Sequence, residues 1–220
     1  MTKPSANPLQ PAVDRRQTEL TRARYNRIAP IYNLMELLPE RRFSGWRQLL
    51  WAKVPAGRIL EVGVGTGKNF PYHPAGVEVV GIDLSERMLA QARRKAEKLG
   101  HPVDLHQMDV QQLDFPDRSF DAAAATFVFC SVPDPVLGLR ELSRVVKPGG
   151  KILLLEHVRI DHPLIGPLMD WFNPLAIRIT GANINRRTVE NVRRAGLIIE
   201  SVTPLGPLNV VRLIEARPAG

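Results

Sequence analysis

The amino-acid sequence predicts an α/β protein built on a doubly wound, mostly parallel sheet. Short apolar stretches alternate along most of the chain with helix-like stretches, the order typical of parallel strands covered by helices. Most of these apolar stretches have few polar positions on either face, as strands buried on both sides require. The last two are separated only by the short connection PLGPL, which predicts an antiparallel hairpin at one edge of the sheet.

Seven stretches are predicted to be strands because they are short, apolar and rich in β-branched residues or leucine. They cover residues 58–64, 77–85, 103–110, 120–129, 151–158, 198–206 and 209–218. Helices are predicted between them: one that Ser85 caps and Gly100 ends, one over 134–146 and one over 185–197. Together these elements predict one domain over residues 54–220.

The first 53 residues differ in character from the rest. Residues 1–13 contain three prolines and few apolar side chains, which predicts a flexible tail. Residues 14–53 have the composition of a helical segment, in which Pro30 should interrupt or kink the first helix and a short second helix should follow. A further helix is predicted over 42–53. Its core-facing side chains would be Trp46, Leu49 and Leu50.

The composition of the chain excludes several classes of protein. No run of about 18 apolar residues is present, so no membrane-spanning helix is expected, and the N-terminus lacks the apolar core of a secretory signal. The single cysteine, Cys130, excludes a disulfide framework within the chain and a cysteine-rich zinc site. The five histidines have no ligand spacing, so no metal is expected. We therefore expect a cytoplasmic protein, either soluble or peripheral on the inner face of the membrane.

The net charge of +8 favours acidic partners. Five arginines fall within residues 14–27, and a basic helix of this kind can lie on an anionic membrane surface. The alternative is a solvated helix face with no partner. Nucleic acid is not expected, because the basic clusters carry no interleaved aromatic residues and no recognition module is visible.

An acid and three glycines follow the first predicted strand, in the stretch RILEVGVGTG. Ligands of open α/β sheets bind beyond the carboxyl ends of the strands, where glycines let the backbone approach a ligand closely. Gly63, Gly65 and Gly67 have the spacing Gly-x-Gly-x-Gly, one residue shorter than the dinucleotide pattern, which weakens the case for pyrophosphate binding. Glu61, just ahead of them, would either fix the glycine turn or meet a ligand ammonium.

Acidic residues also end the next two predicted strands. Asp83 follows Gly63 by 20 residues and can accept two hydrogen bonds from a ribose diol. Asp109 can accept a hydrogen bond from an exocyclic amine, and the backbone N–H of Val110 can donate to a ring nitrogen. Features of this kind at successive strand ends predict a cofactor site.

These stretches resemble a known family. ILEVGVGTG, GIDLSERMLAQA, MDVQQLDFPDRSFDAAAATFVF and LRELSRVVKPGGKILLLE are similar to the successive motifs of class I S-adenosylmethionine-dependent methyltransferases, roughly over residues 55–160. The resemblance implies a Rossmann-like sheet of seven strands, a reversed terminal hairpin and S-adenosylmethionine as cofactor. It also accounts for the short glycine turn, because this cofactor has no phosphates to bind.

The resemblance further implies a role for each motif residue. The three glycines of the turn would pass along the methionine and ribose part of the cofactor. Asp83 would hold the ribose hydroxyls and Asp109 the adenine amine. The remaining implied contacts are Leu84 and Met88 beside the adenine, and Thr126 and Phe127 on the sulfonium side.

The N-terminal stretch RYNRIAPIYNLM is similar to bacterial phospholipid N-methyltransferases and to ubiquinone/menaquinone C-methyltransferases, which carry Tyr-x-x-x-Ala-Pro-x-Tyr-Asp. The matching residues are Tyr25, Ala29, Pro30 and Tyr32, whereas Asn33 stands where aspartate is usual. In these enzymes the segment folds over the cofactor, which implies that residues 14–53 form a helical lid.

A second resemblance concerns the acceptor. FVFCSVPDP, LLLEHV and GANINRRTVENVRRAGL are similar to animal membrane-associated thiol methyltransferases. Both resemblances imply an apolar or membrane-derived acceptor. The stretch 159–185 is more apolar than a connecting loop needs, so we expect a cap over the substrate site; the alternative is that it packs against the N-terminal helices.

Methyl transfer is a direct displacement, so the enzyme mainly has to hold nucleophile, carbon and sulfur in line. An amine or phenol acceptor must also lose a proton. His157, at the end of the fifth predicted strand, is the candidate general base, and Glu156 is another. Tyr25 and Tyr32 could orient an amine through hydroxyl or ring contacts. His157 has the alternative interpretation of an ordinary polar residue at a strand end.

The sequence therefore predicts a methyltransferase acting on a lipid or small molecule, with phosphatidylethanolamine-type N-methylation as the first hypothesis. Quinone C-methylation and thiol S-methylation are the alternatives among enzymes. A non-catalytic module that binds S-adenosylmethionine is the alternative of another class. A nicotinamide-dependent oxidoreductase is disfavoured by Lys68 in the glycine turn and by the position of Asp109.

Overall fold

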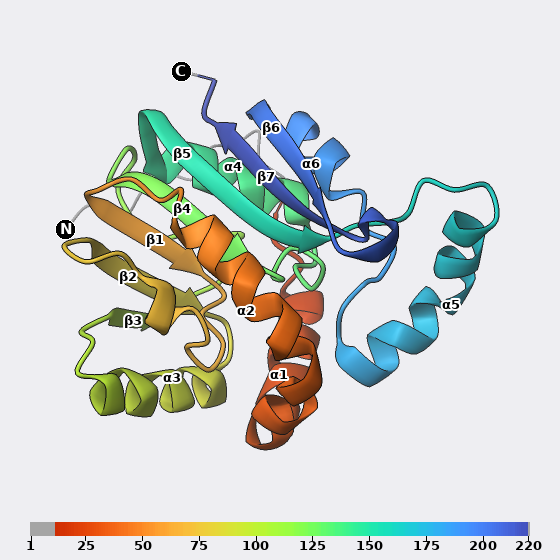
Figure 1. The fold of residues 1–220 in the computed structure, drawn as a ribbon, viewed down its shortest axis with the longest axis horizontal. Helices are drawn as coiled ribbons and strands as arrows, with labels where there is room; N and C mark the ends of the chain where they lie inside the picture. Colours follow the sequence, from red (N-terminus) through yellow and green to blue (C-terminus); the bar gives the residue numbers. More distant parts are fainter. Residues whose placement is uncertain (1–11, 220) are drawn as a thin grey trace.

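A seven-stranded sheet forms the centre of the structure, a computed structural model that describes residues 12–219. The strand order is β3-β2-β1-β4-β5-β7-β6 (Figure 1). All pairs from β3 across to β5 are parallel, whereas β7 runs antiparallel to both β5 and β6. The predicted α/β sheet with an antiparallel hairpin at one edge is thus confirmed, and the reversed strand β7 is second from that edge.

The elements follow the predicted alternation of strand and helix. The strands are β1 (Arg58–Val62), β2 (Glu78–Asp83), β3 (Asp104–Gln107), β4 (Phe120–Thr126), β5 (Val146–His157), β6 (Ile198–Leu205) and β7 (Val211–Arg217). The α-helices are α1 (Arg15–Met35), α2 (Leu37–Trp51), α3 (Glu86–Leu99), α4 (Pro135–Val145), α5 (Ile165–Thr180) and α6 (Thr188–Arg194). Short 3-10 turns cover Phe70–Tyr72 and Pro207–Asn209.

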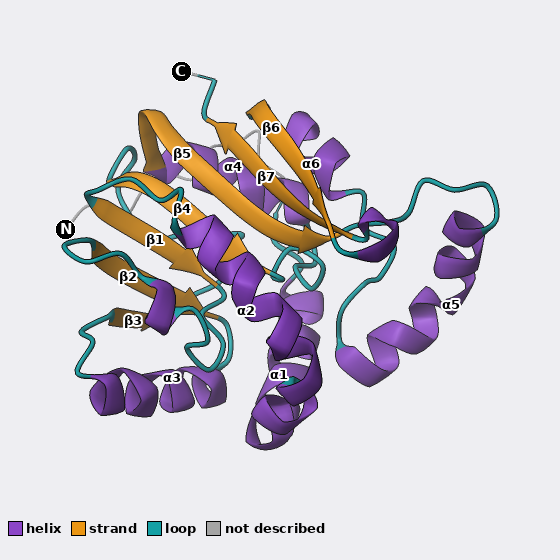
Figure 2. Cartoon of the chain, viewed as in Figure 1, coloured by secondary structure: helices purple, strands orange, loops and turns teal. Residues whose placement is uncertain are grey.

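Helices cover both faces of the sheet (Figure 2). On one face, Leu139 and Leu142 of α4 pack with the inner side chains of the central strands. On the other, Leu50 and Trp51 of α2 are fully buried against β1, β4 and β5. The core-facing stripe predicted for this helix was wrong in one position, because Leu49 is 49% exposed and Trp51 packs into the core instead.

Pro30 does not interrupt the first helix. α1 continues through Pro30 to Met35 as one helix, and the stretch predicted as a short second helix, residues 31–38, is divided between the end of α1 and the start of α2. A proline inside a helix leaves the carbonyl four residues earlier without its N–H partner. Here that carbonyl, on Asn26, accepts a hydrogen bond from Arg87 of α3 at 3.4 Å. The Ala29 carbonyl accepts another from Gln91 at 2.5 Å, so contacts with α3 hold the helix across the proline.

The ends of α3 are those that the sequence predicts. The Ser85 hydroxyl accepts a hydrogen bond from the Met88 N–H at 3.2 Å, and Gly100 ends the helix in the left-handed conformation at φ +58°. Because Ser85 directly follows β2, this cap places the start of α3 beside the end of that strand. The cap therefore helps to position Asp83 and Leu84.

Two helices lie outside the layers of the sheet. α1 lies near the carboxyl ends of the strands, and α5 stands apart from the sheet (Figure 1). Within residues 12–219, no helix is long and apolar enough to cross a membrane. The tail predicted over 1–13 lies outside the described residues except for its last two positions.

Candidate functional site

A cavity lies at the carboxyl ends of β1, β2 and β4, with one wall supplied by α1. Most of the predicted site residues line it: Tyr25, Tyr32, Gly63, Gly65, Asp83, Leu84, Met88, Asp109, Val110, Thr126 and Phe127. Four do not: Glu61, Gly67, His157 and the second base candidate, Glu156. The lining residues that sequence reasoning missed are Thr21, Ile82, Met108, Val128, Ser131, Val132 and Pro133. Several of these flank a predicted residue in the chain, so proximity to the motifs was the signal for them.

Asp83 is held at the end of β2 by two backbone N–H groups. Its Oδ2 accepts from Gly65 and its Oδ1 from Ser85, each at 2.8 Å. Burial raises the pKa of Asp83 to about 6, an effect that these two hydrogen bonds oppose. A carboxylate oxygen has two lone pairs, so each oxygen can accept a further hydrogen bond from a ligand.

The three glycines of the turn differ in what packs against them. All have positive φ, at +65° for Gly63, +55° for Gly65 and +79° for Gly67. A side chain on Gly63 would meet Val128, with its Cβ 2.5 Å from Cγ2. A side chain on Gly67 would meet the buried ring of Phe70, also at 2.5 Å. Gly67 therefore makes room for Phe70 and is not among the residues that face the cavity.

Glu61 belongs to a buried polar network behind the glycine turn. Its Oε1 accepts from the Asn69 side chain at 2.8 Å, and its Oε2 lies 2.9 Å from His73 Nε2. Of the two roles predicted for Glu61, these contacts match the first, fixing the glycine turn. Asn69 also donates to the Thr126 hydroxyl at 3.3 Å, at the end of β4.

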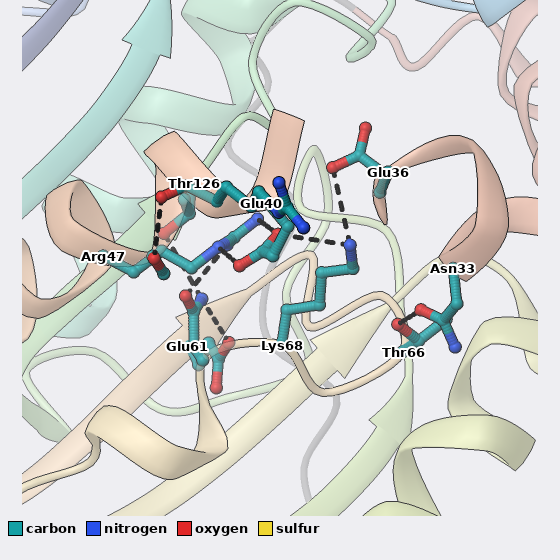
Figure 3. Close-up of polar contacts among 11 residues, drawn as sticks. Asn33, Glu36, Glu40, Arg47, Glu61, Thr66, Lys68 and Thr126 are labelled. Atoms are coloured by element: carbon teal, nitrogen blue, oxygen red, sulfur yellow. Dashed lines mark hydrogen bonds and ion pairs between the residues drawn. The ribbon is translucent and has the colours of Figure 1, made fainter. Parts of the chain in front are cut away.

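The same network reaches the N-terminal helices α1 and α2 (Figure 3). Arg47 of α2 is only 5% exposed and donates to Asn69 at 2.9 Å and to Glu40 at 3.0 Å. Lys68 of the glycine turn forms ion pairs with Glu36 and Glu40. Sequence reasoning missed Arg47, because an arginine in a helix has no pattern that distinguishes a buried partner from a solvated one.

α1 contacts the cavity residues directly. The Thr18 hydroxyl donates to Asp109 at 3.0 Å, and the Gln111 side chain and N–H donate to the same carboxylate.

Asn33, the departure from the family pattern, accepts from the Thr66 hydroxyl at 2.7 Å and donates to Gln91 at 3.1 Å. An amide can do both, whereas an ionised aspartate at this position could only accept.

The loop after β4 forms another wall of the cavity and begins with a strained turn. The strand was predicted to extend to Phe129, but it ends at Thr126, and Phe127 has φ +58°. Glu156 of β5 explains the turn, because its Oε1 accepts from the N–H groups of Val128 and Phe129 at 2.9 and 3.0 Å. Burial raises the pKa of Glu156 to about 7.

The three residues predicted to be catalytic lie in two different places. Tyr25 and Tyr32 line the cavity, and the Tyr25 hydroxyl is 2.5 Å from that of Ser131. Burial raises the pKa of both phenols well above the ordinary value, so both stay neutral. His157 instead packs against Phe127, with ring centroids 4.5 Å apart, and burial lowers its pKa.

Comparison with known proteins agrees with this arrangement. Residues 60–154 match the model of a methyltransferase domain family. The demethylmenaquinone methyltransferase of Renibacterium salmoninarum is 33% identical over 180 residues, which cover 80% of this chain and 73% of that protein. The ubiquinone/menaquinone biosynthesis C-methyltransferase of a Geobacter species is 37% identical over 167 residues, 70% of each chain.

A third relative is more similar over a shorter segment. The phosphatidylethanolamine N-methyltransferase of Cereibacter sphaeroides is 46% identical over 114 residues, which cover 51% of this chain and 55% of that protein. This chain thus matches little more than half the length of that relative. Among solved structures, an S-adenosylmethionine-dependent methyltransferase of Thermotoga maritima has a TM-score of 0.66 at 22% identity, over 88% of this chain and 98% of its own. That likeness concerns the fold.

The chain belongs to the S-adenosylmethionine-dependent methyltransferases. The cavity fits their cofactor in its chemistry. It is lined by a half-buried carboxylate with free acceptor positions at Asp83, a second carboxylate at Asp109, and apolar side chains such as Met88 and Val132. The resemblance inferred from the motifs, the enzyme class and the cofactor are confirmed.

The raised pKa of Asp83 predicts a pH-dependent cofactor affinity. Below about pH 6 the free protein holds this carboxyl protonated. The proton must be lost before the carboxylate can accept hydrogen bonds from ribose hydroxyls, the role that the resemblance implies for Asp83. We expect affinity to be flat from pH 7 to about 6 and to fall about tenfold for each further unit of acidification. Asp83→Asn should bind at least tenfold more weakly at pH 7 and show no such slope.

Calorimetric titration with S-adenosylhomocysteine from pH 5 to 7 measures this dependence. Glu97→Gln, the same type of change at an exposed position of α3, is the control and should keep the wild-type profile. Equal wild-type affinity at pH 5 and pH 7 would show that Asp83 does not hold the ligand.

The contact between Gly63 and Val128 predicts a difference between two glycine substitutions. Gly63→Ala and Gly76→Ala both place an alanine at positive φ, which costs about 1–2 kcal/mol of folding free energy. Only the alanine at position 63 also clashes with another side chain, that of Val128. At Gly76 no heavy atom lies within 4 Å of the added Cβ. We expect Gly63→Ala to cost about 1–3 kcal/mol more in urea unfolding and to weaken cofactor binding. Equal losses in the two variants would contradict this steric account.

Proposed function

We propose that this protein transfers the methyl group of S-adenosylmethionine to a lipid acceptor, with the amine of a phosphatidylethanolamine-type phospholipid as the specific substrate. One observation carries the choice of a lipid. Of the 14 large apolar side chains that are exposed among the described residues, nine form two groups beside the cavity end of the sheet. An apolar surface beside the active site is what an enzyme needs to take its acceptor from a membrane.

The first group, the lid tip, lies where α1 meets α2. It consists of Ile31, Leu34, Met35 and Leu37, which are 44–72% exposed. The second group, the α5 stripe, consists of Leu164, Leu168, Trp171, Phe172 and Leu175, which are 42–77% exposed. The spacing of three and four residues places these five side chains on one face of α5 and the residue before it.

The α5 stripe belongs to the segment 159–185, which the sequence predicts to be a substrate cap. Polar contacts anchor the segment at its base, where Arg159 pairs with Asp170 at 2.9 Å and Oδ1 of the Asn173 side chain accepts from the Ile184 N–H at 2.9 Å. The helix itself stands away from the sheet with its apolar face exposed (Figure 1). Such a helix suits the interface of a bilayer, where tryptophan and leucine side chains insert among the lipids.

We also propose which cavity residues contact the cofactor. Asp83 would accept from the ribose hydroxyls and Asp109 from the adenine amine, with Thr18 sharing the Asp109 carboxylate. Gly63 and Gly65 would pass along the methionine end. Leu84, Met88 and Val110 would surround the adenine, and Thr126 and Phe127 would lie beside the sulfonium, which makes the methyl carbon electrophilic.

On the acceptor side, Tyr25 and Tyr32 offer neutral hydroxyls and ring faces to an amine. The amine must be deprotonated when it attacks. His157 stays neutral because burial lowers its pKa, so it can accept a proton. Its ring does not line the cavity, however, but packs against Phe127, which does. A base role for His157 would therefore require Phe127 to move, or a water molecule to connect the two.

Quinone C-methylation is the second candidate. It is favoured by the greater length over which the quinone-pathway relatives match this chain, 70–80% against 51% for the phospholipid relative. A quinone is also membrane-derived, so the exposed apolar groups suit both acceptors. Thiol S-methylation rests only on the resemblance of short motifs, and a non-catalytic module would keep the cofactor site without turnover.

The deciding experiment offers three acceptors side by side. The protein is incubated with S-adenosylmethionine labelled in the methyl group and with phosphatidylethanolamine vesicles, a demethylated quinone or an alkyl thiol. We expect label in the phospholipid. Label in the quinone alone or in the thiol alone would overturn the phospholipid assignment. Label in none, with cofactor binding shown by calorimetry, would favour the non-catalytic module.

The α5 stripe predicts peripheral membrane binding, which would place the protein on the inner face of the membrane. We expect the protein to co-sediment with vesicles that contain anionic lipid, aided by the basic residues 14–27. Trp171→Ala with Phe172→Ala should lower the bound fraction severalfold, because these two rings are the aromatic members of the stripe. Leu208→Ala, a change at a 66% exposed apolar position that belongs to neither group, should change nothing. Equal binding by all three proteins would remove the membrane role of α5.

A further inference from the structure

A second cavity lies on the other side of the lid from the cofactor site. Its volume is about 880 Å³, and no residue lines both cavities. The wall on one side comes from α1 and α2, through Pro30, Asn33, Leu37 and Glu40. The opposite side is α3, and the floor is the glycine turn together with Pro71 and Tyr72. We refer to this cavity as the α3 groove.

Positive charge dominates the α3 groove. Four cationic side chains line it, Lys68, Arg94, Lys95 and Lys98, against one carboxylate, that of Glu40. Glu40 is already engaged, because it accepts from Arg47 at 3.0 Å and from Lys68 at 3.1 Å. Glu40 therefore neutralises Lys68. The charges of the three cations on α3, Arg94, Lys95 and Lys98, are not neutralised by a carboxylate that lines the groove.

None of the three α3 cations forms an ion pair within the described residues, although Glu40 and Glu61 attract Lys95 from a greater distance and Arg94 donates to the Ala90 carbonyl at 3.2 Å. Among residues 12–219, no carboxylate lies within ion-pair distance of Arg94, Lys95 or Lys98. Lys95 is half-buried, and loss of solvent lowers its pKa. A partly desolvated ammonium without a partner costs free energy that an anion in the groove would recover. The spacing of positions 94, 95 and 98 puts all three on one side of the helix.

The lining of the groove also contains apolar side chains beside the cations and the polar residues Asn33, Thr66 and Gln91. Leu37, which belongs to the lid tip, is 62% exposed, and Leu99 is 47% exposed. Exposed apolar side chains next to cationic ones suit a ligand that has an anionic head and an apolar remainder. The groove also opens beside one of the two surfaces proposed above to meet the membrane.

We propose that the α3 groove binds a phosphate-bearing anion through Lys95, Lys98 and Arg94. The site is separate from the cofactor cavity and does not depend on which acceptor is methylated. Lysine ammonium groups bind phosphate oxygens as point charges, and the arginine adds a planar donor. The phosphate could belong to the headgroup of an anionic lipid or be free in solution, and the two sources are separable by experiment.

The test is calorimetric titration of the full chain with three probes: dihexanoyl phosphatidylglycerol below its micelle concentration, inorganic phosphate, and dihexanoyl phosphatidylcholine. The short-chain lipids exclude binding to a bilayer surface as a cause. Lys95→Gln with Lys98→Gln removes the two lysines of the site. The matched control, Arg140→Gln with Arg194→Gln, removes the same net charge from exposed positions of α4 and α6.

We expect saturable binding of one phosphatidylglycerol per chain, at least tenfold weaker in the lysine variant and within twofold of wild type in the control. Phosphatidylcholine, whose headgroup carries no net charge, should bind at least tenfold more weakly. Binding of inorganic phosphate with the same dependence on the lysines would support the site and assign it to the free anion. Absence of saturable binding by both anions, or equal losses in the two variants, would overturn the proposal.

Cofactor affinity is measured on the same samples. The lysine variant should bind S-adenosylhomocysteine like wild type, because neither lysine lines the cofactor cavity. Unchanged cofactor binding shows that the variant is folded, so a loss of anion binding can be assigned to the groove. A lysine variant that also lost the cofactor would be replaced by the single change Lys98→Gln, at an exposed position, to which the same tenfold criterion applies.

Discussion

The buried carboxylate of Glu61 is the constraint on which the site depends. A carboxylate that is 1% exposed must be fully hydrogen-bonded, and here Asn69 and His73 supply the bonds. Asn69 in turn connects the end of β1 with Thr126 at the end of β4 and with Arg47 in the lid. One polar network therefore fixes the glycine turn, the neighbouring strand end and the helix pair relative to one another.

Two further buried carboxylates shape the cavity by the same principle. Asp83 accepts from the N–H groups of Gly65 and Ser85, which draws the glycine turn towards the end of β2. Glu156 accepts from two N–H groups of the loop after β4 and holds Phe127 at positive φ. Each carboxylate stabilises a loop that has little packing of its own, so the walls of the cavity are set before any ligand arrives.

The features that bear on the acceptor are found outside this preorganised centre. The lid tip and the α5 stripe belong to helices outside the alternating strands and helices of the sheet, and the α3 groove lies where α1 and α2 meet α3. The cofactor is the same throughout the family and needs a rigid site. In the proposed function, the acceptor is bound by the peripheral helices, which are free to differ.

The sequence by itself determined the sheet, the glycine turn and the acids at the strand ends, because these depend on local pattern: apolar runs, capping residues such as Ser85, and glycines that need positive φ. Contacts between distant segments were decided only by the tertiary structure. The helix passes through Pro30 because Arg87 and Gln91 of α3 satisfy the carbonyls around it. Arg47 can be buried because Glu40 neutralises its charge and Asn69 accepts a further hydrogen bond, and no local pattern reports such partners.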